Sequence, residues 1–173
     1  MMNTSAPARQ RGFLMIEALI AILIFTLGIL GMIAMGGTAI GAQSDARYRT
    51  DAARLAENIA NTIALNADRS NPTDPLVLQT SLAPFQHQPT GTVCGAFSGT
   101  ASANALVTSW LSEVTTTGPG LPGLPGTVAG GQQIAISSGA GGYNKVEVTV
   151  CWKDPGTPAA TAMRRHTFVS YVN

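Results

Sequence analysis

Charge is scarce and almost balanced in this chain. Lys, Arg, Asp and Glu make up 11% of its 173 residues, with 10 basic against 9 acidic side chains. A protein that binds nucleic acid through bulk charge carries a clearly basic surface or stripe, so nucleic acid is not an expected partner. The length allows one modest globular domain beside the apolar segment described below.

Cysteine and histidine are also few, and their spacing does not suit a metal site. The sequence contains Cys94, Cys151, His87 and His166, with neither a CxxC pair nor a histidine cluster. In an exported chain, two distant cysteines favour one disulfide, with a pair of free thiols as the alternative. On the chain-entropy model, a bond between Cys94 and Cys151 would stabilise the folded state by roughly 4 kcal/mol.

Catalytic motifs are missing or incomplete. Ser98 lacks the GxSxG elbow, and nothing in the sequence pairs His87 or His166 with a nucleophile. A GxGxxG match at positions 118–123 contains two prolines and lacks the strand-to-helix context of a nucleotide site. We therefore expect no enzymatic activity, no metal and no cofactor.

What the chain does have is one long apolar run that begins at Phe13 and holds a single charge, Glu17. From Ala18 to Ser44 there is no charge for 27 residues, which at about 1.5 Å per residue exceeds a hydrocarbon core of roughly 30 Å. An ionised side chain at the centre of a membrane helix costs about 2.5 to 3.5 kcal/mol. Glu17 is therefore expected to have a partner.

The 12 residues before the run, MMNTSAPARQRG, contain Arg9 and Arg11 but no acidic residue. The positive-inside rule places this end in the cytoplasm and the following domain on the other side of the membrane. A secretory signal peptide would have a shorter apolar region that closes with a small-residue cleavage site. An ordinary membrane anchor is the alternative, although it gives Glu17 no role.

The segment RGFLMIEALIAILIFTLGILG, from Arg11 to Gly31, resembles the processing and assembly segment of type IV pilins and type II secretion pseudopilins. The resemblance implies that a prepilin peptidase cuts between Gly12 and Phe13, that Phe13 is then N-methylated, and that Glu17 is needed for assembly. It also implies contacts of the N-terminal helix with other minor pilins and the major pilin, and with inner-membrane lipid before assembly.

The spacing of the cut and the glutamate has a physical reason. Cleavage would leave a positively charged amine on Phe13 at the edge of the apolar run. In a bundle of staggered helices, Glu17 of one subunit could approach the amine of a neighbour, and a low dielectric favours that pair over two isolated charges. Glycines between Gly28 and Gly41 would let helices approach closely, unless they are ordinary membrane-helix glycines.

After the apolar run, the helical period continues from Gln43 to about Asp68, and Pro72 and Pro75 then end the helix. One face of this part is an apolar stripe of Ala52, Leu55, Ala56, Ile59 and Ile63. Opposite charges at i+3 or i+4 spacing predict three ion pairs on the solvent side, namely Asp45–Arg49, Arg47–Asp51 and Arg54–Glu57.

The rest of the sequence predicts a small α+β head. We expect mostly loop from Thr73 to Gly99, a short helix from Ser102 to about Val114 with Trp110 in the core, and glycine- and proline-rich loops from Gly118 to Gly142. Strand patterns cover three segments, Gln133–Ile136, Lys145–Trp152 and Arg165–Val172.

We therefore expect a long N-terminal helix packed on a small antiparallel sheet of three or more strands. The alternation in the middle strand predicts one buried face. Cations of the last two strands form a solvated set or a phosphate-binding cluster; they are Lys145, Lys153, Arg164 and Arg165.

The order of features in the head is similar to that of minor pilins of the PilV type, also called pilus modification proteins. These features are an alanine-rich polar half of the helix, a Trp-bearing helix, a Leu-Pro-Gly turn and a V-x-V-x-V-x-W strand. Cys94 and Cys151 do not bracket the C-terminal segment as the cysteines of many major pilins do, which makes a major pilin less expected.

The sequence thus predicts a leader peptide over residues 1–12, a transmembrane and assembly segment over 13–44, and a periplasmic head over 45–173. The expected protein is a minor type IV pilin in the inner membrane and, after assembly, in an extracellular pilus. Three alternatives stay open: a type II secretion pseudopilin, a surface module that binds DNA or a host surface, and a plain anchored periplasmic protein.

Overall fold

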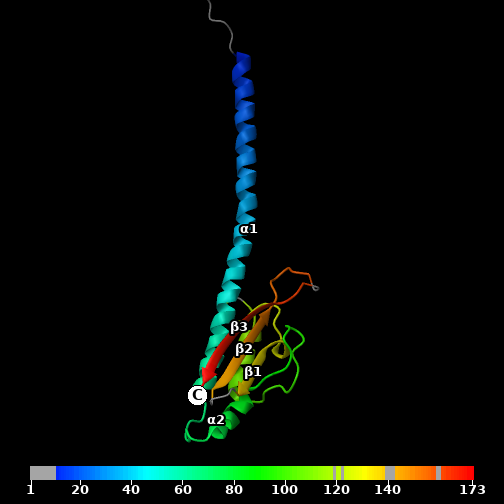
Figure 1. Ribbon diagram of the computed structural model, residues 1–173. Helices are drawn as coiled ribbons and strands as arrows, with labels where there is room; N and C mark the ends of the chain where they lie inside the picture. Colours follow the sequence, from blue (N-terminus) through cyan, green and yellow to red (C-terminus); the bar gives the residue numbers. More distant parts are fainter. Residues whose placement is uncertain (1–10, 119, 122, 139–142, 159–160) are drawn as a thin grey trace, which may run out of the picture. The chain divides into compact units, whose positions relative to one another are not determined.

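The first helix, α1 (Arg11–Leu65), is a single unbroken element of 55 residues in the computed structural model. The structure describes residues 11–118, 120–121, 123–138, 143–158 and 161–173, with side chains from Leu14 onward. The chain divides into two compact units, Met1–Ser44 and Asp45–Asn173, and α1 contributes to both. Figure 1 shows the elements of each unit.

The end of α1 is fixed by an arginine and lies three residues before the expected position. The guanidinium of Arg69 donates from Nη1 to the carbonyl oxygens of Ala64 and Ala67, at 2.7 and 3.3 Å. A cationic side chain that binds the last carbonyls of a helix satisfies acceptors that lack intrahelical donors. This local cap explains why α1 stops at Leu65.

A second helix, α2 (Pro75–Leu82), lies in the segment from Thr73 to Gly99, which was expected to be mostly loop. The segment is mostly loop, but this helix was not expected. Asp74 is the N-cap and its carboxylate accepts from the backbone N–H of Leu76 at 3.0 Å. Pro75 stands in the first turn, where a missing N–H costs nothing. Leu78 and Leu82 bury one face of α2, and a short 3₁₀ turn, η1 (Ala83–Phe85), follows it.

The third helix, α3 (Ala105–Thr115), begins three residues after the expected start because Asn104 is its N-cap. Its buried face consists of Val107, Trp110, Leu111 and Val114. The indole N–H of Trp110 donates to the carbonyl oxygen of Leu55 at 2.9 Å, so this residue is part of the core, as predicted. The hydrogen bond also ties α3 to α1.

Three antiparallel strands follow: β1 (Gln133–Ser138), β2 (Asn144–Trp152) and β3 (Arg164–Val172), with a 3₁₀ turn, η2 (Ala129–Gly131), just before β1. Figure 1 shows them side by side in chain order, an order that the sequence did not determine. The expected α+β arrangement of a long apolar N-terminal helix and a small antiparallel sheet is confirmed.

The core of the head lies between the polar half of α1 and the sheet. The predicted stripe on α1 is buried, together with Ala60, and faces the inner side chains of β2. The outer face of β2 is buried as well at Thr149 and Cys151, so the prediction of one buried face was wrong at this end. The disulfide loop described below accounts for this second burial.

Candidate functional site

The apolar segment of α1, which we define as Leu14–Ser44, has no packing partner inside the described chain. Every side chain in it is exposed, including large ones such as Leu23 and Phe25. By length and composition, this part of α1 is apolar enough to cross a membrane. Water is a poor environment for such a surface, so its packing partners must be lipid or other helices.

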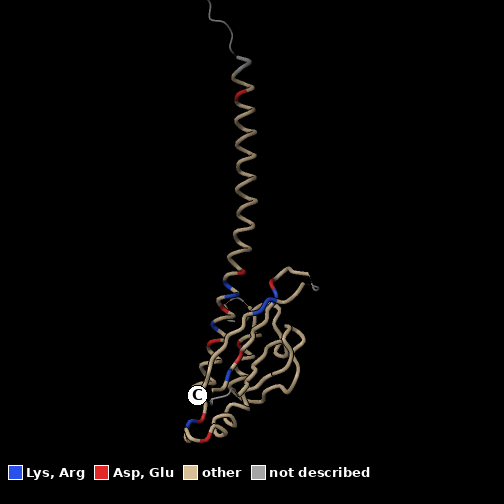
Figure 2. Tube along the Cα trace, in the orientation of Figure 1, with Lys and Arg blue, Asp and Glu red and all other residues tan. Residues whose placement is uncertain are grey.

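Polar groups within this segment fall into two kinds. The hydroxyl groups of Thr26, Thr38 and Ser44 donate to carbonyl oxygens three residues earlier in the helix, at 2.8 to 2.9 Å. The carboxylate of Glu17 has no hydrogen-bond or ion-pair partner within the part of the chain that the structure describes. Glu17 is therefore the one charged group of this segment that still requires an external partner. Figure 2 shows how few charged residues this part of α1 carries.

The segment is also free of close neighbours at its glycines. A Cβ atom added at any of them would meet no heavy atom within 4 Å, and they are Gly28, Gly31, Gly36, Gly37 and Gly41. Their backbone is helical throughout. These glycine positions are thus open to another chain.

Of the residues expected at the processing site, the structure describes only part. Arg9 lies outside the described residues. Arg11 begins α1, and the bond between Gly12 and Phe13 lies in its first turn, but the side chains of these residues are not among those described. The separation of Phe13 and Glu17 is therefore known here only from the helix, in which four residues rise about 6 Å.

The disulfide expected in the head is formed. Cys94 and Cys151 are bonded, with their Cα atoms 5.9 Å apart, and the described residues contain no free cysteine. Cys151 belongs to the outward face of β2, whereas Cys94 lies in the loop that follows η1. The bond therefore holds this loop against the sheet and covers the outer face of β2.

Two adjacent glutamines reinforce the disulfide loop, and no signal in the sequence identified them. The amide of Gln132 donates to the carbonyl oxygen of Cys151 and accepts from its N–H, at 3.1 and 2.8 Å. The amide of Gln133 donates to the backbone carbonyls of Gln88 and Gly91, at 3.0 and 3.1 Å. Both glutamines are buried. The hydrogen bonds of Gln133 fix the position of the loop, and those of Gln132 tie the segment before β1 to the end of β2 at the disulfide.

A network of charges surrounds the start of the head. The predicted pairs Asp45–Arg49 and Arg47–Asp51 are present, with N to O distances of 3.1 and 3.7 Å. The predicted partner of Arg54 was wrong, because its guanidinium reaches Glu113 of α3 at 3.6 Å. Packing of α3 on α1 supplies this carboxylate, which the sequence spacing along one helix could not reveal.

The four cations proposed to cluster on the last two strands are divided by the structure. Arg164 and Arg165 lie at one end of the β2–β3 pair, opposite Trp152 and Cys151. Lys153 follows Trp152 directly, at the same end. Lys145 lies at the other end and pairs with Glu147, whose hydrogen bond raises the pKa of the lysine above its ordinary value. Since Lys145 is six residues along β2 from Cys151, about 20 Å separates the two ends.

Histidine and serine side chains of the head serve as connectors. His87 is buried; its Nδ1 accepts from the backbone N–H of Ser102 at 3.2 Å, and its Nε2 lies 3.1 Å from the carbonyl oxygen of Ala129. The tautomer with a proton on Nε2 satisfies both contacts. Ser98 pairs with Thr90, with its hydroxyl 2.8 Å from that of Thr90. These groups hold loops together.

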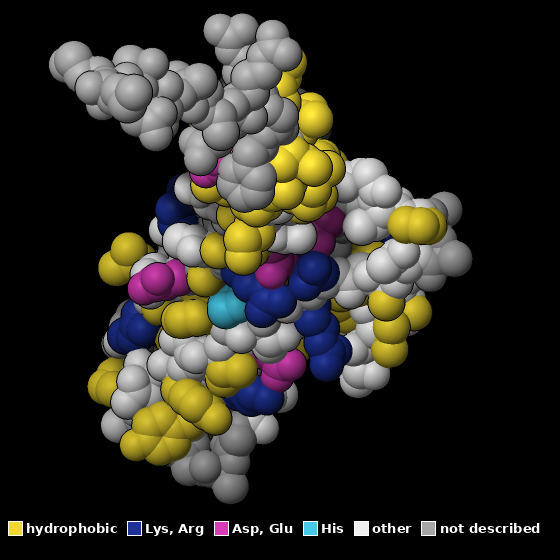
Figure 3. All heavy atoms as spheres, turned by 90° about the horizontal axis from the view of Figure 1, so that it is seen from above, with side chains coloured by type: hydrophobic (Ala, Val, Ile, Leu, Met, Phe, Trp, Pro, Cys, Tyr) yellow, Lys and Arg dark blue, Asp and Glu magenta, His cyan; other side chains and the backbone are white. Residues whose placement is uncertain are grey.

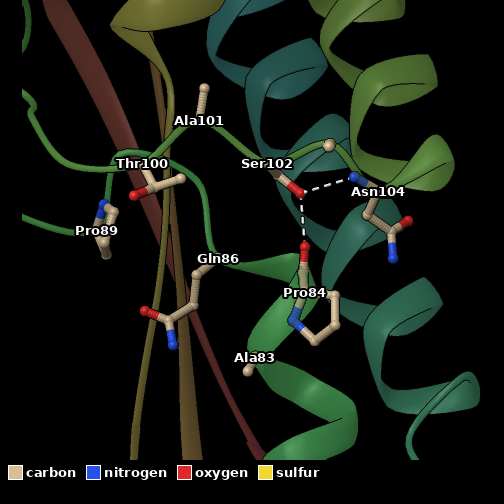
Figure 4. A pocket seen from close by; sticks show the side chains of 9 residues that line it. Ala83, Pro84, Gln86, Pro89, Thr100, Ala101, Ser102 and Asn104 are labelled. Atoms are coloured by element: carbon tan, nitrogen blue, oxygen red, sulfur yellow. Dashed lines mark hydrogen bonds between the residues drawn. The ribbon is translucent and has the colours of Figure 1, made fainter.

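A shallow groove of about 630 Å³ lies between η1 and the start of α3. Its lining is uncharged, and Figure 4 shows the hydroxyl of Ser102 turned toward the carbonyl oxygen of Pro84, to which it donates at 2.6 Å. The same hydroxyl accepts from the N–H of Asn104. The side chain of Ser102 is thus already engaged. Among the described residues, no cluster of His, Cys, Asp and Glu could hold a metal ion.

No family model, curated protein or solved structure matches the chain.

Proposed function

We propose that the chain is a minor type IV pilin: an inner-membrane prepilin that is cut after Gly12, methylated on Phe13 and assembled with other pilins through α1. The observation that carries the proposal is Glu17, a carboxylate without a described partner and the one charged residue of a helix segment that is otherwise almost entirely apolar. The head then lies in the periplasm, and Arg9 and Arg11 stay in the cytoplasm with the leader.

The chemistry of Glu17 supports assembly over simple anchoring. A charge at the centre of a membrane helix costs about 2.5 to 3.5 kcal/mol. Glu17, near the start of the segment, bears part of that cost, and an anchor gains nothing in return. In a helical array, the amine created on Phe13 of one subunit offsets that cost when it lies beside Glu17 of the next. The partner also fixes the axial offset between the two helices, which an apolar surface alone does not specify.

The test is the intact mass and N-terminal sequence of protein recovered from membranes of a host that has its own prepilin peptidase. We expect a chain that starts at N-methylated Phe13. Glu17→Gln should be cut in the same way but fail to enter filaments, whereas Gly12→Leu should remain uncut. Protein that keeps Met1 or Met2 would overturn the proposal and leave a plain membrane anchor.

Deletion in the native host separates assembly from recognition. Loss of pili is the expected phenotype. Loss of secretion with normal pili would instead indicate a type II secretion pseudopilin, and normal pili with lost adhesion or DNA uptake would indicate a binding module.

A further inference from the structure

Arginines follow directly on the apolar segment of α1. Arg47 and Arg49 are three and five residues beyond Ser44, which places them about 5 to 8 Å further along the helix. The polar layer on each side of a hydrocarbon core is also about 5 to 8 Å thick. If α1 spans a membrane to Ser44, as the proposed function requires, both guanidiniums lie at the level of the lipid phosphates.

Strand β3 brings two more arginines to the start of the head. Arg164 reaches Asp45, the residue that follows Ser44, with an N to O distance of 3.2 Å. Its neighbour Arg165 is exposed and donates to the carbonyl oxygen of Thr92 at 2.7 Å. Together these four residues form what we define as the arginine collar: Arg47, Arg49, Arg164 and Arg165. Figure 3, a view from above relative to Figure 1, shows Lys and Arg side chains in dark blue gathered on the face turned toward the viewer.

The ion pairs of the collar are oriented with their positive members outward. Side-chain exposure is 75% for Arg47 against 34% for Asp51, and 61% for Arg49 against 27% for Asp45. Arg164 likewise covers Asp154, at 42% against 20%. The carboxylates therefore lie beneath the guanidiniums, and the outermost charged layer is positive.

The collar retains donors for an external anion. Arg47 and Arg49 use Nε for their carboxylates, and their terminal amino groups have no other acceptor among the described residues. A guanidinium with two free N–H groups on one edge suits the bidentate geometry of a phosphate. Four arginines against Asp45, Asp51 and Asp154 leave a net charge of about +1.

We propose that the arginine collar binds the phosphate groups of anionic phospholipids at the membrane surface from which the head emerges. Covalent attachment to the apolar segment keeps the collar at that surface, so even weak contacts have a high effective concentration of lipid. Duplex DNA would offer similar phosphates, but the nearly neutral chain has no extended basic stripe to follow one. The inference rests on the proposed function only through the membrane-spanning position of α1.

The experiment uses the full chain reconstituted into phosphatidylcholine membranes, with trace spin-labelled phosphatidylglycerol or phosphatidylcholine. Electron paramagnetic resonance then measures the relative association of each lipid with the protein. We expect about a fivefold preference for phosphatidylglycerol, the effect of one net positive charge beside an anionic lipid. The double variant Arg47→Gln/Arg49→Gln reverses the net charge of the collar and should abolish the preference.

Matched controls locate the effect. Arg54→Gln, one arginine further along α1 and paired with Glu113, should keep the preference. Arg9 and Arg11 are replaced by Gln in every chain compared, because these leader cations would attract anionic lipid at the other surface by themselves. Arg164 is left intact because its removal would unpair two carboxylates that are partly buried. Added salt should weaken the preference of the wild type.

The outcomes separate the two proposals. If carbonate extraction releases the wild-type chain from membranes, α1 does not span them, and both proposals are overturned. If the chain is retained but the Arg47/Arg49 variant keeps the lipid preference, only the lipid inference fails. Binding of duplex DNA through Arg47 and Arg49, without a lipid preference, would also overturn it.

Discussion

Up to Ser44 every described side chain of α1 is exposed, whereas beyond Asp45 the same helix buries a continuous apolar stripe. The backbone is helical in both halves, so the difference comes from the side chains alone. The first half is apolar on all sides and needs a surrounding that the chain does not supply. The second half is amphipathic and finds its partner in the head. One helix thus has a first half without packing partners inside the described chain and a second half that packs on the head.

The largest effect should come from a charge placed in the buried half. Leu55→Asp would bury an unpaired carboxylate at a position with 0% exposure, at a cost above about 4 kcal/mol. We expect the near-UV circular dichroism of the head to be lost. The matched Leu30→Asp, in the exposed half, should leave that spectrum intact and weaken membrane insertion instead. A cooperative unfolding transition in Leu55→Asp would contradict the claim that the second half of α1 belongs to the core of the head.

The disulfide gives the next largest effect. Cys94→Ser with Cys151→Ser should lower the free energy of unfolding by about 2 to 5 kcal/mol, because the loop over the outer face of β2 loses its covalent link. Urea unfolding of the head measures the loss. Reductant should bring the wild type to the same midpoint and leave the variant unchanged, and equal midpoints without reductant would refute the prediction.

A smaller effect tests the helix that the sequence did not reveal. Asp74→Ala removes the side-chain acceptor for the N–H of Leu76 and should cost about 1 kcal/mol. Asp74→Asn keeps an acceptor at the same place and should stay near the wild type. Thermal unfolding of both variants is the measurement. Equal losses in the two variants would mean that the cap does not stabilise α2.

The smallest effect concerns pH. The backbone N–H of Ser70 donates to the carboxylate of Asp68 at 2.9 Å and lowers the pKa of Asp68 below its ordinary 3.8. A folded-state pKa below the unfolded one stabilises the head above the ordinary pKa, and this stabilisation is lost as pH falls through the lowered folded value. The free energy of unfolding should therefore decrease less steeply with falling pH for Asp68→Asn than for the wild type. The same pH dependence of the unfolding free energy in the wild type and in Asp68→Asn would show that Asp68 does not contribute to it.

The sequence predicted the elements whose patterns are local. The stripe on α1 follows from i+3 and i+4 spacing, and the middle strand follows from alternation of Val146, Val148 and Val150. Helix α2 was missed because Pro75 was taken as a helix stop, although an aspartate before a proline is also a helix start.

The contacts that the sequence did not predict join distant parts of the chain. Arg54 pairs with Glu113, the amide of Gln132 pairs with the backbone of Cys151, and Arg164 joins β3 to α1. Each depends on how elements pack, which no spacing along one segment encodes. The cleavage and assembly roles of Gly12, Phe13 and Glu17 stay predictions from the sequence.

The internal hydrogen bonds of Thr26, Thr38 and Ser44 have a consequence for motion between helices. A neighbouring helix that slides along the apolar segment breaks no hydrogen bond at these residues, because each hydroxyl already bonds its own backbone. Only at Glu17 does sliding change an electrostatic energy. The segment therefore offers little resistance to axial movement except at one point, and neighbours that stop there would repeat with a constant axial step.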